Sequence, residues 1–274
     1  MGIAYEDRGA REWKRMRFLK GFLINLQFFT SIPIPIVIPM DRSHLKNAVR
    51  TFPLLGLFQG AIYSSLFYIL IEWSLFSSLA IAFVIWLMTI VISGGIHLDG
   101  WMDASDAYFS YQDKEKRLEI MKDPRTGAFG VLSVIVLLSS RFLFLYEITL
   151  MSTADTYLLI LLIPFFSKSV MGGLLLTVNG AKNEGLGAMF QKSATSRDLW
   201  VYCLYVTLVY IFCYRFILEL VILSAMTIVV FIILRKKIVK WFSGITGDVI
   251  GASVEGTEWM LWMTVWLLHY FVMV

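Results

Sequence analysis

The sequence predicts an all-α fold, a polytopic transmembrane helical bundle of about seven spans with its N-terminus in the cytoplasm. The 274 residues are 58% hydrophobic and only 16% charged, and the mean hydropathy is +0.72. These values are typical of a multi-span membrane protein rather than a soluble domain. Most lysines and arginines also fall in alternate loops. Because no linker divides the chain, we expect one integral membrane domain over residues 1–274.

The apolar segments follow one another along the whole chain. Spans are expected near 53–71, 75–96, 128–150, 156–178, 199–218, 220–234 and 257–274. The sixth is short for a hydrocarbon layer about 30 Å thick, so we expect it to tilt little or to thin the bilayer. Residues 18–40 are apolar as well, but Pro33, Pro35 and Pro39 disfavour a straight crossing. A re-entrant or interfacial helix followed by an extended proline-rich turn is expected there.

The positive charges indicate the orientation of the bundle. Of the 24 lysines and arginines, 21 fall in four segments, 8–50, 114–125, 182–197 and 235–240, whereas the turns near 72–74, 151–155 and 219 carry none. Seven spans place all four basic segments on one side, which the positive-inside rule makes cytoplasmic. We therefore expect a multi-pass protein of the cell (inner) membrane. The net charge of +4 reflects this topology, and no nucleic-acid partner is expected.

The most informative segment runs from Gly94 to Asp106 and places His97, Asp99, Asp103 and Asp106 at the end of an apolar run. At about 100° per residue, Asp103 lies about 40° from Asp99 and Asp106 about 20° to the other side. The three carboxylates thus share one helix face, where they repel one another unless a cation is bound. Mg²⁺ prefers carboxylate and phosphate oxygens, and two such ions about 4 Å apart can clamp a diphosphate.

Asp99, Asp103 and Asp106 are accordingly predicted to bind Mg²⁺, with Gly100 leaving the helix backbone open to a ligand. His97 would lie about 160° from Asp99 on the same helix, so we expect it at the entry turn. A water-exposed acidic helix face is the simpler alternative.

Two cytoplasmic loops carry further candidate residues. Between 113 and 130 an amphipathic surface helix is expected to end at Pro124. Arg125, just beyond it, is suited to bind phosphate through two parallel hydrogen bonds. An ordinary basic membrane-edge loop explains this segment equally well. In the loop from 179 to 197, Glu184 stands beside Gly185 and Gly187, which is only a weak signal.

Acidic and basic residues also occur at or within the apolar segments. Asp248 and Glu255 are seven apart and share a helix face, while Gly247 and Gly251 would let a neighbouring helix approach closely. Arg141 and Lys168 lie in mid-span, where facing lipid would cost each about 2.5–3.5 kcal/mol. They must face the bundle interior, a polar cavity or carboxylates. For Lys168, a contact with substrate phosphate and a structural ion pair are equally plausible.

Taken together and in order, these motifs resemble those of the cobalamin synthase family, the adenosylcobinamide-GDP ribazoletransferases. The resemblance spans nearly the whole chain. It rests on Leu26–Pro35, Phe52–Gly56, the His-x-Asp-Gly-x-x-Asp-x-x-Asp block from His97 to Asp106, Leu118–Asp123 with Arg125 and Gly127, Glu184–Gly187, and Thr246–Asp248 with Gly251 and Ala252. The acidic block is highly specific in this context, whereas the glycine-rich pieces alone are weak.

The resemblance implies a Mg²⁺-dependent membrane enzyme that joins adenosylcobinamide-GDP to α-ribazole or its 5′-phosphate and releases GMP. It also implies roles for the residues. Asp99, Asp103 and Asp106 would bind metal, and Asp106 or His97 would act as the base. Lys122 and Arg125 would bind the phosphates. Substrate contacts are further expected from Lys168, Glu184, Asp248 and Glu255. Membrane lipid is an expected partner, and the sequence is compatible with a homo-oligomer.

Two other functions remain open from the residues. A CDP-alcohol phosphatidyltransferase also places spaced aspartates at the cytoplasmic end of a span, but its Asp-Gly is followed by Ala-Arg and its later spacings are wider. A divalent-cation transporter could surround Mg²⁺ with intramembrane acids, yet it should show related halves with paired broken helices. Here the acidic block occurs once.

Overall fold

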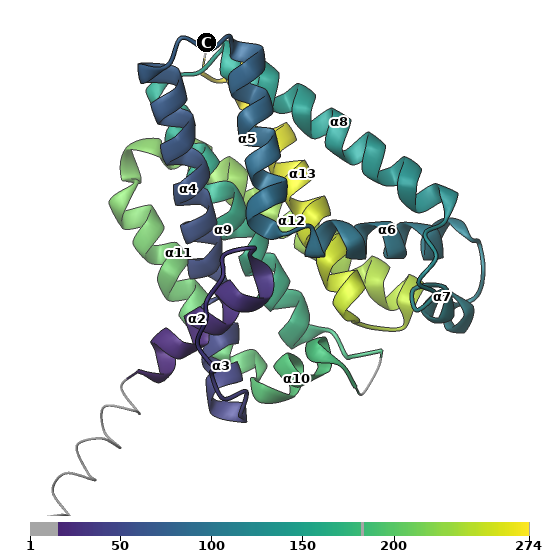
Figure 1. The fold of residues 1–274 in the computed structure, drawn as a ribbon. Coiled ribbons are helices and arrows are strands. Elements are labelled where there is room, and N and C mark those ends of the chain that lie inside the picture. Colours follow the sequence, from purple (N-terminus) through teal and green to yellow (C-terminus); the bar gives the residue numbers. More distant parts are fainter. Residues whose placement is uncertain (1–15, 182–183, 274) are drawn as a thin grey trace, which may run out of the picture.

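The computed structural model describes residues 16–181 and 184–273, and this part of the chain is helical (Figure 1). In chain order the helices are α2 (Arg17–Phe29), α3 (Arg42–Arg50), α4 (Phe52–Trp73), α5 (Ser78–Ser93), α6 (Ile96–Phe109), α7 (Lys114–Ile120), α8 (Ala128–Leu150), α9 (Ala154–Thr177), α10 (Leu186–Ser193), η1 (Ser196–Leu199), α11 (Trp200–Phe212), η2 (Tyr214–Phe216), α12 (Ile217–Phe242) and α13 (Gly247–Phe271). Among these residues the β-type pairing is one isolated bridge between Gly180 and Ile245. The all-α prediction is confirmed.

Four segments within the described ranges are long and apolar enough to cross a membrane. They are Phe52–Trp73, Ala128–Leu150, Ala154–Thr177 and Tyr214–Phe242, and the bent pair α5 and α6 makes a fifth if it counts as one span. The chain is therefore a helical membrane protein. The number of spans, seven, and the cytoplasmic N-terminus stay predictions, and the basic residues before Arg17 and at Lys182 lie outside the described residues.

Three of the predicted spans have different bounds in the structure. The segment 199–218 is not one helix, because α11 ends at Phe212 after 13 residues, fewer than the roughly 20 that a span needs. The segment 220–234 is part of α12, which has 26 residues, so the prediction of a short sixth span was wrong. The last helix begins at Gly247 rather than 257.

Residues 18–40 form a helix followed by extended chain, as predicted. Helix α2 ends at Phe29, and no regular element follows before Asp41. The side-chain amide of Gln27 donates hydrogen bonds to the carbonyls of Ile34 (2.9 Å) and Ile36 (2.6 Å). These bonds hold the proline-rich segment, which cannot supply a regular hydrogen-bond ladder, against the helix. Whether this region enters the membrane stays a prediction.

Helix α9 lies at the centre of the bundle, and most of its residues are buried. Helix α4 packs along it (Figure 1). The contact is close because Gly56 and Gly60 face the carbonyl oxygens of Pro164 and Leu161, and a Cβ atom at either glycine would clash with them. Small residues of this kind let membrane helices approach and gain van der Waals contact. By contrast, α8 and α12 are mostly exposed on their apolar faces, as expected for helices that face lipid.

Candidate functional site

The acidic segment forms a helix that turns away from the helix before it. Gly94 ends α5 with φ +65°, and Gly95 precedes α6 with φ +74°. Both values lie in the left-handed region that glycine adopts without strain. The axes of α5 and α6 therefore meet at 87°, and α6 runs across the bundle rather than along it (Figure 1). With this orientation α6 is not counted among the spans. It carries Asp99, Asp103 and Asp106 on one face, as predicted.

Three helices begin at the same cavity. A pocket of about 170 Å³ is lined by the first residues of α6 (Ile96 and His97), of α10 (Leu186 and Gly187) and of α13 (Gly247 and Asp248). Helices α6 and α10 are preceded by Gly95 and Gly185, and neither start has a side-chain cap. The first backbone N–H groups of a helix lack partners within it and carry partial positive charge. Convergent helix N-termini of this kind suit a phosphate group.

Two glycines hold α13 against α6 at this cavity. A Cβ atom at Gly100 would lie 2.6 Å from the carbonyl oxygen of Asp248, and one at Gly251 would lie 3.3 Å from the backbone of His97. The expectation that Gly251 admits a neighbouring helix is thus met. Gly100 serves the same contact, so the expectation that it leaves room for a ligand was wrong. The crossing brings Asp248 beside the acidic face of α6.

The four carboxylates nearest the cavity have different surroundings. Asp99 is exposed and lines the cavity together with Asp248. Asp103 is half-buried, and its pKa is raised to about 6 by desolvation and by the negative charges of Asp99, Asp248 and Asp106. This shift shows that the carboxylates act on one another electrostatically.

In the described part of the chain, no three acidic, histidine or cysteine side chains stand together as a metal site. The predicted cage of Asp99, Asp103 and Asp106 is therefore not preassembled. Mg²⁺ usually takes only one or two protein carboxylates and completes its shell with water and substrate phosphate. Asp99 and Asp248, which share the cavity, fit that requirement by the chemistry of their oxygens.

Asp106 holds the start of α8. Its Oδ2 accepts a hydrogen bond from the backbone N–H of Gly127 (2.7 Å), and its Oδ1 accepts one from the N–H of Gly130 (2.8 Å). A Cβ atom at either glycine would overlap the carboxylate. Asp106 thus satisfies two N–H groups that a helix start leaves without partners. This contact gives it a structural role that the sequence did not suggest.

His97 is the second residue of α6, so its placement at an entry turn before the helix was wrong. The side chain is 3% exposed. Its ring stacks on Phe29 with centroids 5.8 Å apart, and Nε2 has no hydrogen-bond partner among the described residues. His97 lines the cavity with Asp99.

The predicted phosphate-binding residues of the loops lie apart from the cavity lining. Arg125 pairs with Asp123 (Nη2–Oδ2 2.6 Å) and is exposed. Lys122 and Glu184 are exposed as well, and Glu184 lies two residues before the start of the cavity-lining helix α10. Helix α7 ends at Ile120, four residues before the expected stop at Pro124. The substrate contacts of Lys122, Arg125 and Glu184 stay predictions.

Lys168 and Glu255 belong to ion pairs inside the bundle. Arg141 on α8 donates a hydrogen bond to Glu255 on α13 (2.5 Å), and Lys168 on α9 contacts Glu258 on α13 (3.3 Å). All four side chains are buried. Arg141 therefore faces a carboxylate, as expected. Neither Lys168 nor Glu255 lines the cavity. For Lys168 the pair agrees with the structural alternative, and the substrate contacts of both residues stay predictions.

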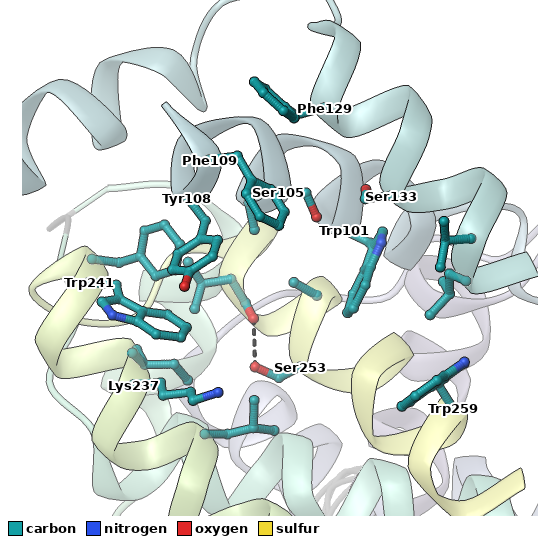
Figure 2. A pocket seen from close by; sticks show the side chains of 18 of the residues that line it. Trp101, Ser105, Tyr108, Phe109, Phe129, Ser133, Lys237, Trp241, Ser253 and Trp259 are labelled. Atoms are coloured by element: carbon teal, nitrogen blue, oxygen red, sulfur yellow. Dashed lines mark hydrogen bonds between the residues drawn. The ribbon is translucent and has the colours of Figure 1, made fainter. Parts of the chain in front are cut away.

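A larger cavity of about 650 Å³ lies between α6, α8, α12 and α13 (Figure 2). Trp101, Tyr108, Phe129, Trp241 and Trp259 line it, and none of the predicted site residues does. Its wall is almost entirely aromatic and aliphatic, with Lys237 as the charged residue. The smaller cavity, where carboxylates and helix N-termini meet, is therefore the better candidate for a phosphate-binding site.

The sequence did not identify the aromatic residues and the helix starts that form the cavity. Phe29, Phe52 and Phe190 line it, and Gly185 and Gly247 stand at the starts of α10 and α13. A glycine adjacent to an acidic residue was the available signal at two of these helix starts, in Glu184-Gly185 and Gly247-Asp248.

The chain is similar in sequence to known proteins of one family. A family model described as cobalamin-5-phosphate synthase matches residues 21–266. The chain is 42% identical to the adenosylcobinamide-GDP ribazoletransferase of Geobacillus sp. (strain WCH70), over 93% of this chain and 98% of that protein. It is 39% identical to that of Geobacillus kaustophilus (92% and 97% covered) and 34% identical to that of Clostridioides difficile (92% and 99% covered). No solved structure matches.

The family model covers the start of α6, the start of α13 and the aromatic residues of the cavity, and the relatives align over almost their full length. The resemblance drawn from the motifs is thereby confirmed: the chain belongs to the cobalamin-5-phosphate synthase family.

Proposed function

We propose that this transferase of cobalamin synthesis joins adenosylcobinamide-GDP to α-ribazole, or to its 5′-phosphate, and releases GMP. The relatives are adenosylcobinamide-GDP ribazoletransferases, and this name indicates the two substrates. The observation that carries the proposal is the convergence of three helix N-termini and the carboxylates of Asp99 and Asp248 on one cavity. Such a site favours the negative charge of a diphosphate and leaves room for a cation on its acidic side.

The reaction requires positioning and charge stabilisation rather than covalent work by side chains. A hydroxyl oxygen of the ribazole attacks the phosphorus bonded to cobinamide, and the bond from that phosphorus to GMP breaks. The hydroxyl proton passes to a carboxylate of the acidic face. The backbone N–H groups at the starts of α6, α10 and α13 hold the phosphate oxygens. Mg²⁺, held by Asp99 and Asp248, would neutralise charge on the diphosphate when bound.

The site is proposed to face the cytoplasm. The cavity is lined by the first residues of α10, and α2, α3 and α10, which carry described basic residues, lie at the same end of the bundle (Figure 1). The positive-inside rule places that end on the cytoplasmic side, where phosphorylated substrates are available.

The proposal is tested with purified protein in liposomes. GMP release is measured with adenosylcobinamide-GDP and α-ribazole together, with each alone, and with Mg²⁺ removed by a chelator and then restored. We expect GMP only when both substrates and Mg²⁺ are present. Release of CMP from a CDP-lipid without release of GMP would favour the lipid enzyme instead, and Mg²⁺ uptake that survives Asp103→Asn would favour a transporter.

A methyl group at Gly247 should weaken catalysis without weakening the fold. A Cβ atom there would have no neighbour within 4 Å, and the backbone does not have a positive φ, so Gly247→Ala introduces neither a clash nor strain. The methyl would stand at the start of α13, where phosphate must approach the backbone. We expect kcat/KM to fall about tenfold, since small displacements of bound groups are costly in catalysis, with the Tm unchanged.

Gly185→Ala is the matched contrast to Gly247→Ala. Gly185 is also open to space, but its φ is +92°, so an alanine there is strained and should lower the Tm as well as kcat/KM. An undiminished kcat/KM in Gly247→Ala would show that phosphate does not approach this helix start.

A further inference from the structure

Three phenylalanines from distant parts of the chain form one wall of the catalytic cavity. Phe29 ends α2, Phe52 begins α4 and Phe190 lies on α10. The Phe29 centroid is 5.6 Å from that of Phe52 and 5.8 Å from that of Phe190, and the Phe52 and Phe190 centroids are 5.8 Å apart. Phe52 and Phe190 are almost fully buried. The proposed mechanism uses none of these rings, although all three line the cavity together with Asp99 and Asp248.

A single uncharged polar side chain stands in this wall. Met171, Leu175, Leu186 and Ile250 complete its apolar part. His97 stacks on Phe29 at an interplanar angle of 17°, and its Nε2 is buried without a hydrogen-bond partner among the described residues. Buried polar atoms are nearly always hydrogen-bonded in native proteins, so an unpaired atom of this kind in a residue that lines a cavity indicates a ligand group that completes the bond.

We propose that this wall receives the bicyclic base of the ribazole acceptor and that Nε2–H of His97 donates a hydrogen bond to the free ring nitrogen of that base. The inference rests on the proposed function. A benzimidazole has a large apolar edge and, once joined to ribose, a single hydrogen-bond acceptor in its ring. One polar atom in an aromatic and aliphatic wall matches that pattern.

The other groups of the substrates fit this wall less well. Guanine presents several donors and acceptors around its edge, and in a wall with one polar atom most of them would be left without partners, which is costly. A corrin ring is too large for a cavity of about 170 Å³, which is close in volume to a cavity that binds one small aromatic molecule. The benzimidazole therefore fits this wall better than guanine or the corrin ring does.

The placement also fits the direction of the reaction. With the base against Phe52 and Phe190, the attached ribose lies in the same cavity as Asp99, Asp248 and the helix starts. Its hydroxyl then faces the phosphorus held at those helix starts. On this assignment His97 contacts the base of the acceptor and is not the general base of the reaction.

The test removes, one at a time, the proposed donor on His97 and the ring nitrogen that would accept its hydrogen bond. Wild type and His97→Phe are assayed with α-ribazole and with the corresponding indole riboside, in which a C–H group replaces the free ring nitrogen. The KM for each acceptor and the KM for adenosylcobinamide-GDP are measured. Phe129→Leu, in the larger cavity, is the control, because it removes a ring that does not touch this wall.

We expect the KM for α-ribazole to rise about tenfold in His97→Phe, in line with the loss of one buried hydrogen bond, while the KM for adenosylcobinamide-GDP changes less than twofold. The wild type should prefer α-ribazole to the indole riboside about tenfold, and His97→Phe should not discriminate. Phe129→Leu should leave all three KM values unchanged.

Other outcomes overturn the inference. A rise in the KM for adenosylcobinamide-GDP alone would place guanine against this wall. A fall in kcat with unchanged KM values would return His97 to the role of base. If His97→Phe does not fold, equal wild-type KM values for α-ribazole and the indole riboside still refute the hydrogen bond. Absence of GMP release by the wild type would instead refute the proposed function itself.

Discussion

Asp99→Asn and Asp248→Asn proteins are expected to release GMP about a thousandfold more slowly than the wild type while folding normally. Both side chains line the cavity and are not buried, so the loss of one charge should not disturb packing. In the proposed reaction they hold the Mg²⁺ that neutralises charge on the diphosphate. Removing one group that stabilises developing charge typically costs 10²–10³ in kcat, and the loss of a cation adds to that.

The measurement is GMP release over a range of Mg²⁺ concentrations, together with the Tm of each variant. Asp106→Asn is the informative comparison, because both carboxylate oxygens of Asp106 accept backbone N–H groups of α8. An amide can accept only one of these bonds, so this variant should lose about 1–2 kcal/mol of stability, as helix-cap deletions do. Full activity in Asp99→Asn and Asp248→Asn, with loss only in Asp106→Asn at an unchanged Tm, would move the cation to the other end of α6.

The sequence predicts those features of the site that depend on one helix alone. The spacing of Asp99, Asp103 and Asp106 places them on one face of any helix that contains them, and α6 contains all three. The bend at Gly94 and Gly95 was predictable for the same reason, because two adjacent glycines interrupt a helix locally.

The rest of the site depends on how helices dock, which the local pattern does not specify. Asp248 reaches α6 because Gly100 and Gly251 let two backbones meet, and α10 starts at the cavity because it packs on α3 and α9. Asp106 was assigned to metal because its spacing places it on one helix face with Asp99 and Asp103, whereas its partners, Gly127 and Gly130, lie more than 20 residues away.

The same limit applies inside the bundle. The sequence showed that Arg141 could not face lipid, but the pairing of Glu255 with Arg141 and of Glu258 with Lys168 requires the positions of three helices. The sequence does not indicate a role for Glu258, because a glutamate within an apolar run has no local feature that identifies its partner.

Arg141→Met is expected to lower the free energy of unfolding by about 3–5 kcal/mol. Arg141 and Glu255 are 1% and 3% exposed and form a hydrogen-bonded pair between α8 and α13. Removal of one partner leaves a buried charge uncompensated, and such changes cost about 3–5 kcal/mol in proteins. Lys168 does not replace the arginine freely, because its Nζ already contacts Glu258 (3.3 Å). The measurement is unfolding in detergent micelles, followed by denaturant or heat.

The double variant Arg141→Met with Glu255→Met distinguishes the cost of an uncompensated buried charge from the cost of the altered packing. It removes both partners, so it should be closer to wild type in stability than Arg141→Met alone. Arg215→Met, at an exposed arginine of η2, is the matched control and should cost less than about 0.5 kcal/mol. Because Glu255 and Asp248 lie on the same helix, α13, loosening this pair should also slow GMP release. A stable Arg141→Met protein with normal turnover would show that the position of Asp248 is set by the contact of Gly100 with Gly251 rather than by the buried ion pair.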